Sequence, residues 1–560
     1  MKKTISVLIL VLAVLTAVFA HPIYEQKSIR IFSTSDTHGK FVGYDYPSDS
    51  VSTSGSLAQI STLVKENRTE NTILVDVGDT IQGNSSIMFF DEDPVHPSIR
   101  AMNLMGYDAV VPGNHDFNYG IDMFQKQFSQ LECPVICANV YYEDGSRIGL
   151  PYIIIERSGV KVGIIGTVTY LIEVWDAKIF EDAHMKVTVP LDEIKELAKE
   201  LRPQVDVLVL ATHMDCDNEL EFPHTGTHEI AEQVPELDII LAGHGHKAIN
   251  EYINGVLIVE NKIQGKTVCC VDVDLEYGPD GKYHIIKKTG TVFETADYAE
   301  DPVIVNDSVI AASHQQTVSD LNAVIFRLTN DYLAPPNRFE GMSEARLIDT
   351  ALSRLINDAQ KYFAKSQLSA CSVVEDNANL YKGDIRRSDM ILVYRYDNSL
   401  SKIQITGNQI RKYIEWCANY FDTFEKGDNS VAENPKIINL AYDIFSGLKY
   451  EIDISKPFGE RVGEITLLDG TPLDPNGQYT MAVSTYRYTT HLMTYGIIFS
   501  EEDGLPVLLE AGIGDDIGGI REMIAEYIVK VIGKPCADGT IELTLEEVTP
   551  ENANWRVIGY

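Results

Sequence analysis

The sequence has few cysteines, few positive charges and only one long hydrophobic run, and each shortage excludes a class of protein. The eight cysteines among 560 residues have no zinc-finger spacing, and a chain of this length does not depend on disulfides to fold. Only 46 lysines and arginines accompany 82 acidic residues, which gives a formal net charge of -36. Such a surface repels polyanions, so neither a nucleic-acid polymer nor an anionic membrane is the expected partner. An anionic substrate would need local positive charge, such as bound metal.

The single long hydrophobic run lies at the amino terminus. Lys2 and Lys3 precede an uncharged apolar stretch that ends at Val18-Phe19-Ala20, a pattern typical of a secretory signal peptide over residues 1–20. An uncleaved anchor helix is the alternative, but the run is shorter than the ~20 residues that span a bilayer. Loss of the two lysines would change the net charge from -36 to -38. We therefore expect a secreted, periplasmic or cell-surface protein with no transmembrane segment beyond the signal peptide.

Short apolar runs in the first half of the chain end repeatedly in polar loops. The runs 28–36, 72–77, 109–111, 205–211 and 237–242 lead into SDTHGK, GDT, GNHD, TH and GHGH. Helical spacing of apolar residues over 55–68, 96–105 and 191–201 alternates with these runs. This alternation predicts an α/β domain with covered sheet faces, and such sheets hold their sites at the carboxyl ends of strands.

The polar loops offer metal ligands. Each loop alone has an ordinary explanation, since an Asp after Gly is usually a turn or cap and a lone His is usually a surface residue. Together they supply two carboxylates, one amide and at least four imidazoles, enough for two divalent cations if Asp79 bridges them. Two such cations can bind the oxygens of a phosphate ester and supply a hydroxide for in-line attack. Mixed nitrogen and oxygen ligands accept Zn, Mn, Fe or Co, so the sequence leaves the metal open.

These loops resemble the signature of the calcineurin-like metallophosphoesterases. The longer runs HPSIRAMNLMGYDAVVPGNHDFNYG and ILAGHGH are similar to the 5'-nucleotidase family, above all to its 2',3'-cyclic-nucleotide 2'-phosphodiesterase/3'-nucleotidase branch. The resemblance implies a four-layer α/β/β/α metallophosphoesterase domain over residues 21–300, followed by an α+β substrate-binding domain. It also implies a metal-dependent phosphoric ester hydrolase that acts on nucleotides.

The resemblance assigns roles to single residues. It implies two metal-ligand sets: Asp36, His38, Asp79 and His246 for one cation, and Asp79, Asn114, His213 and His244 for the other. His115 matches the catalytic histidine that faces the substrate phosphate. Nucleotidases of the 5' type orient that histidine with an Asp three residues later, where this chain has Asn118. The cyclic-phosphodiesterase branch shows the same Asn, which favours that branch.

The second half of the chain is expected to bind the nucleotide. Polar composition after Tyr277 and helical spacing over 301–321 predict a linker and connecting helix over 301–340. A second domain over 341–560 would begin with the helical pattern SEARLIDTALSRLINDAQKYF. The resemblance implies three substrate contacts: Tyr442 and Tyr486 as aromatic walls around the base, and Asn398 in an Asn-x-Leu element. The Gly-Gly-x-Arg element with which many members bind phosphate is missing around residues 371–380, and Arg487, Arg386 or Arg387 could replace it. Packing is the alternative for the tyrosines, because strand tyrosines usually pack.

The sequence therefore predicts an exported nucleotidase or cyclic-nucleotide phosphodiesterase with two divalent metal ions. A nucleotide-sugar hydrolase of the same family and a non-catalytic nucleotide-binding surface protein are the alternatives. Specificity for 5', 3' or 2',3'-cyclic phosphate, base preference and oligomeric state are left open.

Overall fold

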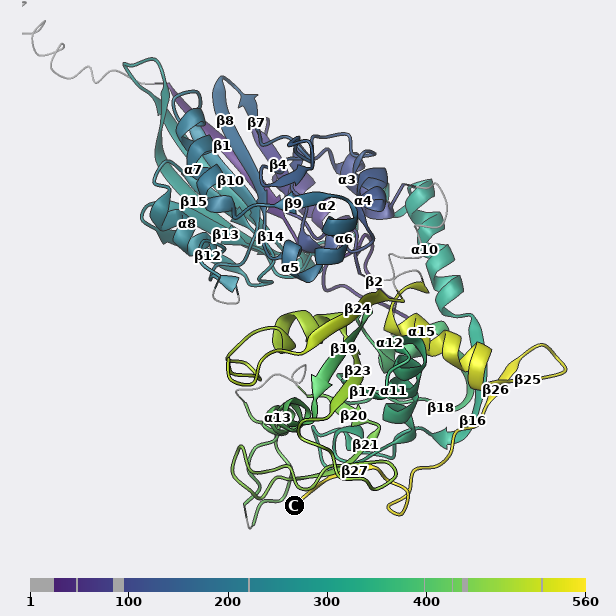
Figure 1. The fold of residues 1–560 in the computed structure, drawn as a ribbon. Helices are drawn as coiled ribbons and strands as arrows, with labels where there is room; N and C mark the ends of the chain where they lie inside the picture. Colours follow the sequence, from purple (N-terminus) through teal and green to yellow (C-terminus); the bar gives the residue numbers. More distant parts are fainter. Residues whose placement is uncertain are drawn as a thin grey trace, which may run out of the picture.

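The computed structural model describes residues 25–560 apart from 47–48, 84–94, 220–221, 397, 426, 436–441 and 515–516. Two bodies, each built of sheets and helices, are connected through helix α10 (Ser308–Leu321), which runs along one side of the molecule (Figure 1). The expected signal peptide lies outside the described residues. In the part of the chain that is described, no helix is long and apolar enough to cross a bilayer. None of the eight cysteines, all of which are described, forms a disulfide.

The first body contains two sheets. One has the strand order β15-β14-β1-β4-β5 and the other β12-β13-β11-β10-β8-β7. The first sheet consists of β1 (Gln26–Thr34), β4 (Thr72–Asp76), β5 (Ala109–Val110), β14 (Thr267–Tyr277) and β15 (Tyr283–Glu294). The second consists of β7 (Tyr152–Arg157), β8 (Val160–Val168), β10 (Val207–His213), β11 (Ile239–Ala242), β12 (Ile249–Ile253) and β13 (Val256–Glu260).

The two sheets pack against each other and helices cover their outer faces. In β1, Ile31 belongs to the apolar cluster between the sheets, whereas Phe32 packs on the helical side, because successive side chains of a strand point to opposite faces. The helices α2 (Leu57–Asn67), α3 (Pro97–Met105) and α4 (Ile121–Phe128) cover the first sheet. The second sheet is covered by α7 (Pro190–Leu201) and α8 (Thr227–Gln233). This is the expected α/β/β/α arrangement.

Parallel pairing brings the ends of several strands to a common edge. The strands β1, β4 and β5 are parallel neighbours in the first sheet, and β8, β10, β11 and β13 are parallel neighbours in the second. The loops that follow β1, β4, β5, β10 and β11 are the five polar loops of the sequence. Their side chains therefore meet at the carboxyl ends of the strands.

The second body has its own sheet and core. Its largest sheet has the order β20-β17-β23-β19-β24, with β17 (Leu368–Cys371), β19 (Leu400–Thr406), β20 (Ile444–Ser446), β23 (Gln478–Ser484) and β24 (Val507–Ile513). The helices α11 (Ala351–Ala364), α13 (Gly407–Ala418) and α15 (Ile520–Tyr527) pack on it. Helix α11 begins later than its pattern suggested, because Thr350 and Ser353 form a capping box there.

The second body also contains a strand inside the segment predicted to be a linker. Strand β16 (Val324–Tyr332) lies between β18 (Tyr381–Arg386) and β26 (Ile541–Leu543) in a four-stranded sheet. The prediction of a linker over all of 301–340 is therefore wrong for this part. Only Phe326 and Leu328 of β16 are fully buried, so its alternation is short, and both neighbours are distant in sequence.

Candidate active site

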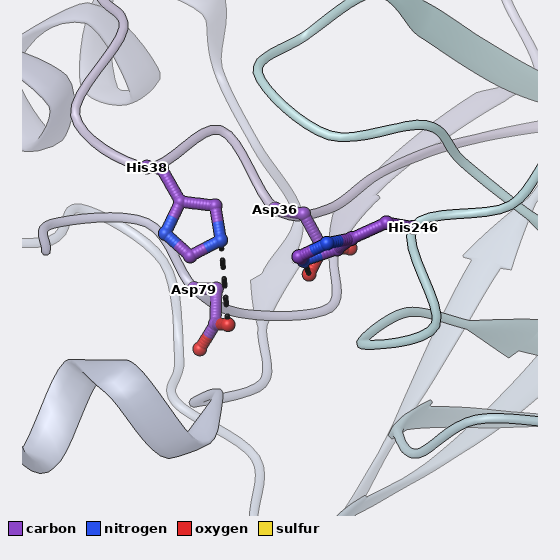
Figure 2. Close-up of side chains that lie close together, drawn as sticks. All are labelled: Asp36, His38, Asp79 and His246. Carbon is purple, nitrogen blue, oxygen red and sulfur yellow. Dashed lines mark ion pairs between the residues drawn. The ribbon is translucent and has the colours of Figure 1, made fainter. Parts of the chain in front are cut away.

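Four of the predicted metal ligands form one compact group. Asp36 and His38 follow β1, Asp79 follows β4, and His246 follows β11; each offers a ligand atom within 4.8 Å of the others. His38 Nε2 lies 3.6 Å from Asp79 Oδ2, and His246 Nε2 lies 3.3 Å from Asp36 Oδ1. Figure 2 shows the four side chains turned toward one another. Two carboxylates and two imidazoles at this spacing are suited to one divalent cation.

A second group shares Asp79 with the first. Asp79, His213 and His244 also offer ligand atoms within 4.8 Å of one another, and His213 Nε2 lies 3.2 Å from Asp79 Oδ2. Asn114 Oδ1 lies 3.1 Å from the same His213 nitrogen. His213 Nδ1 is 2.6 Å from the Val77 carbonyl oxygen, which leaves Nε2 for a ligand bond. The structure thus brings together all seven side chains predicted as ligands.

The chemistry of this donor set fits a pair of cations. His38 Nε2 and Asp79 Oδ2 are buried without hydrogen-bond partners in the described structure, which is costly unless another group meets them. Burial alone would raise the pKa of Asp79, but His213, His115 and His38 lower it well below its usual value. Burial lowers the pKa of His38 despite Asp79 beside it. Burial lowers the pKa of His213, but Asp79 raises it to about 10 overall. A cation at the second group would therefore displace a proton from His213, because an ionised carboxylate and a neutral imidazole are the forms that bind metal.

The backbone around the ligands is closely packed. A Cβ on Gly78 would lie 2.3 Å from the Gly113 nitrogen, and a Cβ on Gly113 would lie 2.2 Å from Asp79 Oδ1, so only glycine fits at these two loop tips. Asp116 accepts hydrogen bonds from four backbone N–H groups, those of Gly113 and residues 79–81. Asp116 therefore holds the two loops together.

Five ligands adopt the left-handed backbone conformation, which is uncommon for residues other than glycine. They are Asp36, His38, Asp79, His244 and His246, with φ between 47° and 81°. Such residues cost roughly 1 to 3 kcal/mol each and cluster at functional sites. The fold thus maintains five unfavourable backbone conformations at the place where the ligand atoms converge.

His115 lies beside the ligands without belonging to either group. It is in the short 3-10 helix η2 (Asn114–Phe117) after β5, and its backbone N–H donates to Asp79 Oδ1 at 2.9 Å. Its ring centroid is 5.5 Å from that of His38. Its Nδ1 is 2.7 Å from Asn118 Oδ1. Asn118 therefore holds this side chain at the edge of the cluster.

The cluster opens into a cleft between the two bodies. The cleft has a volume of about 960 Å³ and is lined by Asn114, His115, Trp175 and His244 on one side and by residues of the second body on the other. Asn398, Tyr486 and Arg487 are among the latter, so two of the three predicted substrate contacts and one candidate phosphate ligand face the predicted metal ligands.

Tyr442 does not reach the cleft. Its side chain is 1 % exposed, its hydroxyl donates to the Arg346 carbonyl oxygen at 2.9 Å, and its ring stacks on Tyr420. Tyr442 is a core residue, and the prediction that it forms a wall of the base pocket is wrong. A buried aromatic satisfied by a backbone acceptor has no face for a ligand.

Tyr396, which was not predicted from the sequence, lines the cleft and is 41 % exposed. Strands β19 and β23 are antiparallel, with Leu400 opposite Ser484. The start of β19 and the end of β23 therefore lie at the same end of the sheet, and Tyr396 and Tyr486 lie close to it in sequence. Tyr396 lies only two residues before Asn398 in the sequence. The pairing of β19 with β23, which places it at the cleft, cannot be predicted from residue spacing.

Arg487 is held by an internal ion pair. Its guanidinium contacts Asp443 at 2.7 Å, and the two side chains are 3 % and 4 % exposed. Burial alone would raise the pKa of Asp443, but Arg487 lowers it overall. Although Arg487 borders the cleft, its donors are directed in part to this carboxylate, so we expect it to stabilise the second body.

Replacing Arg487 with methionine should lower the free energy of unfolding by about 3 to 5 kcal/mol, because it leaves the Asp443 charge buried and unpaired. Urea unfolding monitored by fluorescence measures this. Arg327→Gln is the control, because Arg327 pairs with Asp384 at the surface. This substitution should lower the free energy of unfolding by less than about 1 kcal/mol. Unchanged stability together with weakened ligand binding would instead make Arg487 a direct ligand contact.

Comparison with known proteins agrees with the division of the chain into two bodies. The calcineurin-like phosphoesterase profile matches residues 29–248 and the profile of the 5'-nucleotidase C-terminal domain matches residues 324–493. A 2',3'-cyclic-nucleotide 2'-phosphodiesterase/3'-nucleotidase of Salmonella typhimurium is 24% identical over 87% of this chain and 86% of its own length. The trifunctional nucleotide phosphoesterase protein YfkN of Bacillus subtilis is 26% identical over 82% of this chain, which spans only 36% of that relative.

A solved structure has the same fold over nearly the whole chain. The crystal structure of a putative 5'-nucleotidase from Staphylococcus aureus superimposes with a TM-score of 0.75 and 20% identity, and the match covers 95% of this chain and 100% of that one. The two family profiles together match more than half of the sequence. The chain therefore belongs to the calcineurin-like phosphoesterases that carry a 5'-nucleotidase C-terminal domain.

Proposed function

We propose that this protein is an exported phosphoesterase that uses two divalent metal ions to hydrolyse nucleotides to nucleoside and phosphate. The observation that carries the proposal is the pair of ligand groups joined by Asp79 at a cleft. The wall opposite presents two half-exposed tyrosines, Tyr396 and Tyr486. Phosphate chemistry on one side and flat aromatic surfaces on the other suit a phosphorylated nucleoside.

The metal-domain residues would act on the phosphate. Asp36, His38, Asp79 and His246 would hold one cation, and Asp79, Asn114, His213 and His244 the other. When bound, the cations would neutralise charge on the phosphoryl oxygens and activate water for in-line attack. His115, outside both ligand groups, would stabilise the phosphate and give a proton to the departing oxygen. Local positive charge would allow a protein of net charge -36 to bind an anion.

The second body would bind the nucleoside. Tyr396 and Tyr486 would stack on the two faces of a base, which tolerates several bases because every base has a flat face. Asn398, which also lines the cleft, would supply a polar contact. This pair of aromatic side chains replaces the Tyr442–Tyr486 pair expected from the sequence.

Substitution of either tyrosine tests this assignment. Tyr396→Ala and Tyr486→Ala should each weaken nucleotide binding by about 1 to 3 kcal/mol, or roughly 5- to 150-fold in KM, with a smaller effect on kcat. Tyr381→Ala is the matched control, because Tyr381 is 62% exposed and lies outside the cleft lining. Steady-state kinetics provide the values. If neither variant changes KM, the base lies elsewhere.

A substrate panel tests the proposed function itself. Purified protein loaded with Zn, Mn, Fe or Co should release phosphate from 3'-AMP and open 2',3'-cyclic AMP, since Asn118 favours that branch, and it should lose activity in chelator. Parallel assays with AMP and a nucleotide sugar identify a 5'-nucleotidase or a nucleotide-sugar hydrolase. No hydrolysis with any metal would leave a nucleotide-binding surface protein and contradict the proposal.

A further inference from the structure

The ring of His115 is held by a chain of two hydrogen bonds. His115 Nδ1 is 2.7 Å from Asn118 Oδ1, and Asn118 Nδ2 donates to Asp176 Oδ1 at 3.2 Å and Oδ2 at 3.1 Å. Asp176 is 58 residues from Asn118 in the sequence. All three residues line the cleft. The side chain that meets the substrate is therefore connected to a carboxylate from a distant segment.

The donors and acceptors of His115, Asn118 and Asp176 determine which group donates in each of the two hydrogen bonds. An ionised carboxylate only accepts hydrogen bonds, so Asp176 requires the NH₂ group of Asn118 to face it. The amide oxygen of Asn118 then faces His115 and accepts from its Nδ1, which must carry a hydrogen. Nε2 is left as the ring nitrogen available to the substrate, and it can give a proton to the departing oxygen when the ring is protonated on both nitrogens.

Asp176 also lies in a segment that contacts both the metal ligands and the second body. It joins the short helices α5 (Ile172–Trp175) and α6 (Ala177–Asp182). The preceding residue, Trp175, stacks on His244 with ring centroids 5.5 Å apart and planes at 24°. Helix α5 in turn contacts the π-helical turn η7 (Tyr488–Leu492) of the second body, just after Tyr486. One short segment thus holds His115, covers a metal ligand and touches the nucleotide-binding body.

We propose that Asp176 is a positioning residue that acts through Asn118 to fix the tautomer and orientation of His115. This rests on the proposed function. In nucleotidases with a carboxylate at the position of Asn118, one residue would orient the histidine directly. In this protein the carboxylate is that of Asp176, one hydrogen bond further from the histidine. Because the Asn118 NH₂ group faces Asp176, the Asn118 amide oxygen faces His115.

Exchange of the two side chains distinguishes positioning from general structural support. Asp176→Ala should lower kcat by roughly 10- to 100-fold, the usual effect of removing such an outer partner, with KM changed less than about threefold. Asn118→Asp alone should also be slow, because it places a second carboxylate within 3.1 Å of Asp176. The double variant Asn118→Asp/Asp176→Asn keeps an acceptor facing His115 Nδ1 and pairs it with a donor at position 176, so the bond between 118 and 176 is reversed but both groups stay paired, and most of the lost kcat should be recovered.

Three further measurements complete the test. Metal content and melting temperature should match those of the wild type in every variant, and Asp122→Asn, at an exposed position on α4, should be indistinguishable from it. In zinc-loaded protein labelled with [15N]histidine, and assigned with His115→Gln, the His115 signal should show hydrogen on Nδ1 in the wild type and a tautomer mixture in Asp176→Ala. This signal needs no turnover, so it tests positioning even if the substrate panel shows no hydrolysis.

The proposal is overturned by either of two results. One is an unchanged His115 tautomer and kcat in Asp176→Ala. The other is a double variant no faster than Asn118→Asp alone, which would show that hydrogen-bond polarity along the chain does not control His115.

Discussion

Replacing Asp79 with alanine is expected to remove both metal ions and reduce phosphate release by at least roughly 10⁴-fold, or about 5.5 kcal/mol of transition-state stabilisation. The reason is that Asp79 is the one residue common to both ligand groups. Its Oδ2 lies 3.2 Å from His213 Nε2 and 3.6 Å from His38 Nε2. Metal content by plasma mass spectrometry and phosphate release by colorimetry measure the two effects.

Two companion variants separate metal loss from misfolding. Asp79→Asn keeps the volume and an acceptor for the His115 backbone N–H, but lacks the charge, and should also fail to hold both ions. Asp272→Asn lies in the same sheet, in a surface ion pair with Arg30, and should retain metal and activity. An Asp79→Ala protein that remains active with two bound ions would contradict the bridging role.

Replacing His115 with glutamine should leave both ions bound and lower kcat by about 10²- to 10⁴-fold, the range for loss of a general acid or base. His115 belongs to neither ligand group. The contact it makes with Asp79 comes from its backbone N–H, which the substitution preserves. KM should change little, because in the proposed function the second body supplies the nucleoside contacts.

Comparison of kcat, KM and metal content decides the role of His115. Tyr119→Phe, a neighbouring partly buried residue outside both ligand groups and the cleft lining, serves as the control and should remain within about threefold of the wild type. A His115→Gln protein that has lost one ion would make His115 a metal ligand instead. An unchanged kcat would remove it from the chemistry.

Much of the metal domain could be predicted because its signals are local. Each ligand follows a short buried strand directly, and the carboxyl ends of parallel strands meet at one edge, so order along the chain predicts proximity in space. Asp36, Asp79 and His213 illustrate this: they follow or end β1, β4 and β10 and converge at one place. The covered sheets likewise follow from apolar runs with intervening helices.

The residues proposed to bind the nucleotide were harder to predict because their positions depend on pairing between distant segments. Tyr396 reaches the cleft only because β19 pairs with β23, whereas Tyr442, in a segment with an equally aromatic pattern, is buried against Tyr420. Asp176 illustrates the same limit, since no local pattern connects it to Asn118 58 residues away. Strand β16 was missed because its pairing partners lie far along the chain.

Anomalous diffraction from crystals grown with Mn²⁺ tests whether Asp79 is shared by two metal ions. We expect two peaks on either side of the Asp79 carboxylate, about 3.5 to 4 Å apart, one near Asp36, His38 and His246 and the other near Asn114, His213 and His244. A single peak, or peaks remote from Asp79, would contradict a metal pair bridged by this residue.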